Sequence, residues 1–160
     1  MTARVLVAGV GNIFLGDDGF GPEVARQLAG QPLPEHVRVI DYGIRGMHLA
    51  YDLLDGYDAL VIVDALPGGK QPGELTVLEV GPDDLGDGEF DAHGMDPVAV
   101  LANLESLGGQ LPYTLVVGVQ PADVAEHIGL SPTVQAAVPA AVSTVRRLVA
   151  DLPAPTPVEA

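Results

Sequence analysis

Short, mainly apolar runs recur along the chain, and each is bounded by glycine, proline or a charged residue. A run of this kind is typical of a strand in a parallel sheet that helices cover on both faces. Two of the runs end in aspartate, at Asp41 and Asp64, and a further segment, 75–80, alternates as a half-exposed strand near a sheet edge does. The strands predicted in this way cover residues 5–10, 37–41, 59–64 and 113–119, and the first of them is expected to be buried.

Apolar residues at helical spacing fill most of the segments between these strands. The first predicted helix has an apolar side around residues 24–28 and is expected to end at Gly30. Ser131 and Pro132 predict the start of the final helix, in which Pro139 implies a kink or a late start. Two further helices are predicted over residues 47–54 and 96–107.

This alternation of strands and helices predicts an α/β protein, a three-layer α/β/α sandwich around a mostly parallel, twisted five-stranded sheet. The 160 residues fit a single domain. We assign the domain to residues 1–151 and expect the proline-rich tail, 152–160, to be disordered. Residues 81–94 hold five acids and four glycines, and we expect them to form a mobile acidic loop that serves the functional site.

Composition and charge exclude several functional classes. The chain has 22 acidic and 7 basic residues, a net charge of -15, so the clustered cations of a nucleic-acid-binding protein are missing. The absence of cysteine excludes disulfides, iron-sulfur ligation and a cysteine nucleophile. No apolar stretch reaches the ~18 residues that cross a bilayer, and residues 1–4 lead into the first strand without a signal-peptide hydrophobic region. We expect a cytoplasmic protein that binds neither nucleic acid nor membrane.

A glycine-rich turn follows the first strand, with glycines at 9, 11, 16, 19 and 21. A dinucleotide-binding turn is the first hypothesis for such a segment. It fails because Phe14 stands where the third glycine is needed, and because Asp17 and Asp18 would repel a pyrophosphate at the helix entrance. The chain also has no Gly-x-Ser-x-Gly motif, which argues against a serine nucleophile.

Carboxylates and an imidazole remain as candidate chemistry: Asp17 or Asp18 after the first strand, Asp64 at the end of the third, and His93 in the acidic loop. The first and third strands of a doubly wound sheet commonly lie side by side, about 5 Å apart, so their terminal acids converge. Carboxylates with imidazole suit zinc, nickel, iron or manganese, and three ligands leave positions open for water or substrate. Each candidate also has a simpler explanation. Asp17 or Asp18 fits a helix cap, Asp64 fits an acceptor for loop amides, and His93 fits a solvent-exposed histidine.

The chain resembles, over nearly its whole length, the hydrogenase maturation endopeptidases that process the large subunit of nickel-iron hydrogenases. The motifs that carry the resemblance are Gly9-Val10-Gly11-Asn12, Gly16-Asp17-Asp18-Gly19-Phe20-Gly21, Asp41-Tyr42-Gly43 with Gly46-Met47, Val63-Asp64-Ala65, Pro72-Gly73-Glu74, Asp91-Ala92-His93-Gly94-Met95 and Gly118-Val119-Gln120-Pro121. The resemblance implies that Asp18, Asp64 and His93 are the nickel-recognising ligands. Asp17 is then left as the cap of the first helix.

The resemblance further implies a nickel-dependent endopeptidase that cuts the C-terminal extension from a nickel-loaded large-subunit precursor, with Asp18 or Asp64 as the general base. The nickel would arrive on the precursor, and we expect the protease to be monomeric. Arg45 is a candidate to bind the terminal carboxylate of the extension or another acid of the substrate, or to pair with Asp41. Two alternatives remain from the residues alone: a small-substrate metallohydrolase with its own zinc or manganese, and a non-catalytic checkpoint for nickel loading.

Overall fold

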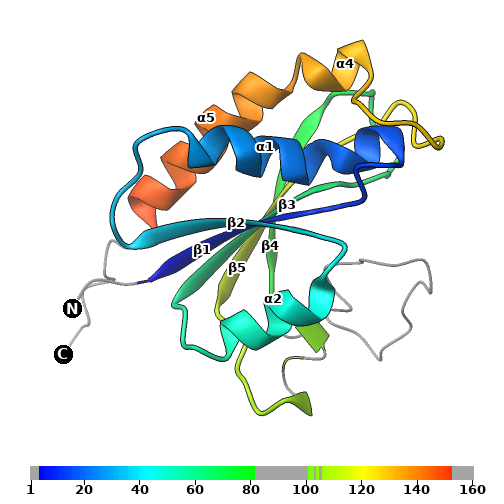
Figure 1. Ribbon diagram of the computed structural model, residues 1–160. Helices are drawn as coiled ribbons and strands as arrows, with labels where there is room; N and C mark the ends of the chain where they lie inside the picture. Colours follow the sequence, from blue (N-terminus) through cyan, green and yellow to red (C-terminus); the bar gives the residue numbers. More distant parts are fainter. Residues whose placement is uncertain (1–3, 82–100, 103, 105, 153–160) are drawn as a thin grey trace.

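A single twisted sheet organises the protein, and its strands follow the order β2-β1-β3-β5-β4 (Figure 1). The computed structural model describes residues 4–81, 101, 102, 104 and 106–152. Strands β1, β2, β3 and β5 are parallel, whereas β4 runs antiparallel to β5 at the edge of the sheet. Their bounds are Val5–Val10 for β1, Val37–Gly43 for β2, Ala59–Ala65 for β3, Leu75–Val80 for β4 and Tyr113–Val119 for β5.

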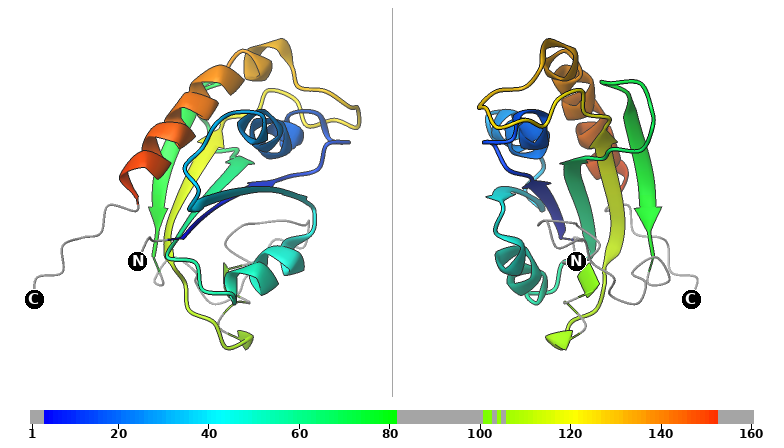
Figure 2. Two further views of the ribbon diagram at one scale, coloured as in Figure 1. Left: turned by 60° about the vertical axis from the view of Figure 1, so that its left-hand side comes forward. Right: turned by 90° about the vertical axis from the view of Figure 1, so that its right-hand side faces the viewer.

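Helices cover both faces of this sheet (Figures 1 and 2). One apolar cluster joins α1, α4 and α5 to one face, and a second joins α2, Leu101 and Leu104 to the other. The helices are η1 (Gly16–Gly19), α1 (Phe20–Ala29), α2 (Gly46–Leu53), α4 (Pro132–Gln135) and α5 (Val138–Asp151). The predicted three-layer α/β/α sandwich around a mostly parallel five-stranded sheet is confirmed.

Several local predictions hold among the described residues. Every residue of β1 and β3 is buried, as expected for strands covered on both faces. Ser131 caps α4, and Pro139 lies in the first turn of α5, so the proline marks a late helix start rather than a kink. The acidic loop, His93, the start of the 96–107 helix and the tail from residue 153 lie outside the described residues.

The glycine-rich turn allows a close approach of backbone segments. A Cβ atom on Gly21, in the first turn of α1, would lie 2.2 Å from the carbonyl oxygen of Val63 and 2.4 Å from that of Val10. Gly11 has φ +143°, and a Cβ atom there would lie 1.9 Å from the carbonyl oxygen of Asp18. Gly21 therefore makes the tight helix–strand contact that the third glycine makes in dinucleotide-binding folds. Gly11 and Gly21 therefore let η1 and α1 pack closely against the ends of β1 and β3.

Replacing Gly21 by alanine is expected to lower the free energy of unfolding by about 1–3 kcal/mol, because the new methyl group overpacks against backbone atoms that cannot move aside. Gly68→Ala is the matched control, since a Cβ atom there meets nothing within 4 Å. We expect this control to stay within about 0.5 kcal/mol of the parent. Urea unfolding of both variants measures the difference, and equal midpoints would contradict the close-packing role of Gly21.

Candidate active site

The candidate site lies at the carboxyl edge of the sheet, where β1 and β3 are direct neighbours. The two strands pair in parallel with Gly9 opposite Val63, which confirms that the first and third strands lie side by side. Asp64 is the next residue of β3 and is only 5% exposed. Its Oδ1 accepts a hydrogen bond of 2.8 Å from the backbone N–H of Ala65. This hydrogen bond orients the carboxylate of Asp64 near the strand end, and its donor is the last residue of β3 rather than a loop amide.

Asp18 lies in η1, between the end of β1 and the start of α1, and is half-buried. Its Oδ2 accepts a hydrogen bond of 2.8 Å from the backbone N–H of Asn12. The Oδ1 of Asn12 in turn accepts from the N–H of Phe14 at 2.9 Å, which stabilises the same turn. Within the described part of the chain, the Oδ1 of Asp18 has no hydrogen-bond partner. The turn therefore orients this carboxylate and leaves one of its oxygens available to a ligand.

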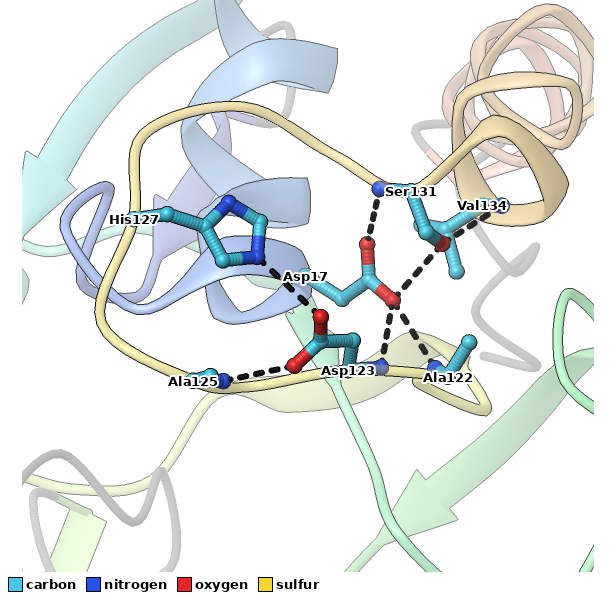
Figure 3. A network of polar contacts seen from close by, with 7 residues as sticks. All are labelled: Asp17, Ala122, Asp123, Ala125, His127, Ser131 and Val134. Carbon is cyan, nitrogen blue, oxygen red and sulfur yellow. Dashed lines mark hydrogen bonds and ion pairs between the residues drawn. The ribbon is translucent and has the colours of Figure 1, made fainter.

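Asp17 is not the cap of the first helix, contrary to the prediction. The N-cap of α1 is Gly19, and no side chain caps that helix. Asp17 is fully buried and points instead toward the segment that follows β5 (Figure 3). It accepts four hydrogen bonds of 2.7–2.9 Å, from the N–H groups of Ala122, Asp123 and Ser131 and from the Ser131 hydroxyl.

The hydrogen bonds to Asp17 determine its charge state. Burial alone would raise the pKa of this carboxyl group, because a buried carboxylate loses hydration. The donors from Ser131, Ala122 and Asp123 outweigh burial and hold the pKa of Asp17 below its usual value. Asp17 is consequently a buried carboxylate that stays charged at neutral pH and joins the two segments.

Backbone contacts extend the joint between η1 and residues 122–131. The N–H of Gly16 donates to the carbonyl of His127 at 2.9 Å, and the N–H of Asp17 donates to that of Asp123 at 2.8 Å. The imidazole of His127 lies 3.3 Å from the carboxylate of Asp123 (Figure 3). We call this set of contacts around Asp17 the clamp. The clamp fixes the turn that presents Asp18. No sequence motif indicates the clamp, because its residues are far apart along the chain.

The structure does not place a histidine ligand beside Asp18 and Asp64 among the described residues. His93, the predicted imidazole ligand, lies outside the described residues. His48 is exposed on α2, whereas His36 precedes β2 at the opposite edge of the sheet. Within the described ranges, no three His, Cys, Asp or Glu side chains lie close enough together to hold a metal ion. The set Asp18, Asp64 and His93 stays a prediction.

A pocket of about 310 Å³ opens beside Asp18, between residues 11–14 and residues 41–45. Arg45 lines it, but does not pair with the carboxylate of Asp41, which accepts the N–H of Gly43 at 2.9 Å. The guanidinium donates instead to the backbone carbonyls of Asp41 at 2.7 Å and Tyr42 at 3.1 Å. The predicted contact between Arg45 and Asp41 therefore exists, but it involves the main chain.

Comparison with known proteins identifies the family. A family model described as hydrogenase maturation protease matches residues 22–148. The hydrogenase 2 maturation protease of Escherichia coli K12 is 37% identical over 147 residues, which cover 89% of this chain and 88% of that protein. The chain belongs to the hydrogenase maturation protease family.

Solved structures of this protease family share the fold. The hydrogenase-maturating endopeptidase HybD of E. coli superposes with a TM-score of 0.81 at 32% identity, covering 93% of both chains. A hydrogenase 2 maturation peptidase from a Thaumarchaeota archaeon gives a TM-score of 0.73 at 32% identity, covering 92% of this chain and 98% of that one.

Family membership makes the protein an endopeptidase and therefore an enzyme. A non-catalytic checkpoint and a small-substrate metallohydrolase, the two alternatives left by the residues, do not fit this class. Among the described residues, no helix is both long and apolar enough to cross a bilayer.

Proposed function

We propose that this protease removes the C-terminal extension of a nickel-iron hydrogenase large-subunit precursor by cutting one peptide bond, and that it acts only after nickel has been loaded. The observation that carries the proposal is the pair of carboxylates in a member of this protease family: Asp64 near the end of β3, and Asp18 in η1, after the end of the neighbouring strand β1. Metal ligands from two adjacent strand ends can bind one ion of the substrate together.

The donor chemistry supports recognition of a metal that the substrate already holds. Asp18, Asp64 and His93 supply carboxylates and an imidazole, which suit nickel. The chain has no cysteine, so this set binds free nickel only modestly, whereas thiolates of a precursor hold it strongly. A precursor without nickel then lacks the group that these three residues recognise. Nickel loading becomes the condition for productive binding.

Hydrolysis needs a base and a polarised carbonyl or water. In the proposed mechanism, nickel on the precursor polarises the attacking water or the scissile carbonyl, and Asp18 or Asp64 accepts the proton of that water. The two carboxylates differ in their surroundings, since Asp64 is buried and Asp18 is half-buried with one oxygen available. Their fixed hydrogen bonds to Ala65 and Asn12 pre-orient them before the precursor binds.

Intact-mass measurement of the precursor tests the proposal. We expect the nickel-loaded precursor to lose one C-terminal fragment when it is incubated with the protease, and the metal-free precursor to keep its mass. A precursor loaded with zinc in place of nickel is the control for metal identity. Cutting of the metal-free precursor at the same rate would contradict the nickel requirement. An unchanged mass for the nickel-loaded precursor would contradict the cleavage itself.

A further inference from the structure

The pocket beside Asp18 has an apolar rim that is exposed in the free protein. Ile13, Phe14 and Ile44 line the pocket and are 47%, 60% and 62% exposed. The chain contains only three phenylalanines, so it is notable that Phe14 lies in solvent rather than in a core. Clustered exposed apolar side chains mark interaction surfaces in otherwise polar proteins. This rim is suited to an apolar side chain of a bound peptide.

Arg45 gives the same pocket a fixed positive charge. Its Nε and Nη2 donate to the backbone carbonyls of Tyr42 and Asp41, which hold the planar guanidinium in one orientation. Tyr42 is itself held, because it is buried and its hydroxyl donates to Asp52 at 2.5 Å. Among the described residues, no carboxylate pairs with Arg45. A guanidinium that is pre-oriented and lacks an acidic partner is a ready receptor for a carboxylate.

Asn12 connects the pocket to the candidate site. Asn12 lines it and also donates the hydrogen bond that orients Asp18. A peptide residue in the pocket therefore lies within a few residues of the bond that is cut.

We propose that this pocket is a specificity subsite for the precursor segment next to the scissile bond. An apolar side chain of that segment packs against Ile13, Phe14 and Ile44, and a neighbouring acidic side chain binds Arg45. The volume of about 310 Å³ is at the small end of the ~300–1,000 Å³ that ligand pockets span, as one or two side chains require. This inference rests on the proposed function, because it takes the precursor as the substrate.

Peptide binding without nickel tests the subsite separately from cleavage. The probes are synthetic peptides of the cognate precursor that span its cleavage position, in which each acid is replaced in turn by its amide. We expect Arg45→Met to weaken binding of the parent peptide about tenfold, the loss of roughly one charge-assisted contact of 1.4 kcal/mol. The peptide in which the Arg45-binding acid is replaced by its amide should bind equally to the parent protein and to Arg45→Met. Equal binding of the parent peptide by both proteins would overturn the subsite.

Three further variants make the test specific. Phe14→Ser should weaken binding of every peptide that keeps the apolar residue, whereas Arg147→Met, at an exposed arginine on α5, should bind as the parent does. With the nickel-loaded precursor, Arg45→Met should raise KM more than it lowers kcat. Arg45→Glu should regain processing when the precursor acid is replaced by lysine, and failure of that exchange would overturn the charge contact. If the parent enzyme cuts no precursor, the proposed function fails instead.

Discussion

Replacing Asp64 by asparagine is expected to slow precursor processing by about 100-fold or more, because Asp64 is a proposed ligand of the precursor's nickel. Loss of a ligand should exceed the ~10–100-fold effect of losing a residue that only hydrogen-bonds to a ligand. Asparagine keeps the size of the side chain, and its amide oxygen still accepts the Ala65 N–H that Asp64 binds. The variant removes the charge while the buried strand end stays intact. Single-turnover processing of a nickel-loaded precursor measures the effect, and the unfolding midpoint reports the fold.

Asp18→Asn and His93→Ala are expected to behave in the same way if the three residues act together. Asp55→Asn is the matched control, since Asp55 is an exposed acid in the turn after α2. It should process precursor at the parent rate. Normal processing by Asp64→Asn and Asp18→Asn would locate the active site elsewhere.

The neighbouring aspartate should affect stability instead. Asp17→Ala is expected to lower the free energy of unfolding by about 2–4 kcal/mol, because several buried donors lose their acceptor at once, at ~1–3 kcal/mol for each that stays unsatisfied. The four hydrogen bonds of the clamp are the physical reason. Asp18→Ala, which removes one hydrogen bond at a half-buried position, should cost about 1 kcal/mol. Urea unfolding of the two variants compares them, and equal losses would contradict the clamp.

The clamp also predicts how the stability of the protein depends on pH. The pKa of Asp17 is lower in the folded protein than its ordinary value of 3.8. Its contribution is therefore complete above the unfolded pKa, and is lost as pH falls from about 4 through the lower folded value. Between pH 6 and pH 3, the parent should lose stability more steeply than Asp17→Asn, which cannot titrate there. Parallel curves would contradict a charged Asp17.

Much of the sheet could be predicted from local pattern alone. The runs that became β1 and β3 are apolar at nearly every position because helices cover both of their faces. The alternating run that became β4 predicted a half-exposed strand near an edge, and β4 is the edge strand with none of its six residues buried. Adjacency of β1 and β3 also followed from general rules for doubly wound sheets. Burial and edge position of a strand are visible in the apolar pattern of neighbouring residues, so they can be predicted without knowledge of tertiary contacts.

The roles of the two aspartates could not be separated in this way. Asp17 and Asp18 have the same side chain and adjacent positions, and the difference between them arises from Ala122, Asp123 and Ser131, which are more than a hundred residues away. The contact role of Gly21 is equally nonlocal, because it depends on the carbonyl groups of β1 and β3. Local pattern predicts that an acidic turn exists, whereas tertiary contacts decide which acid is structural.

The clamp has a consequence for the order in which the protein acquires its activity. Asp17 binds partners at separations of 105, 106 and 114 residues, so the loop that it closes is among the longest in the chain. The clamp cannot form until residues 122–131 have been synthesised, because the four donors to Asp17 lie in that segment. Asp18 leaves the ribosome more than a hundred residues before Ser131, so a nascent chain can hold the turn that presents Asp18 by these contacts only after Ser131 has emerged.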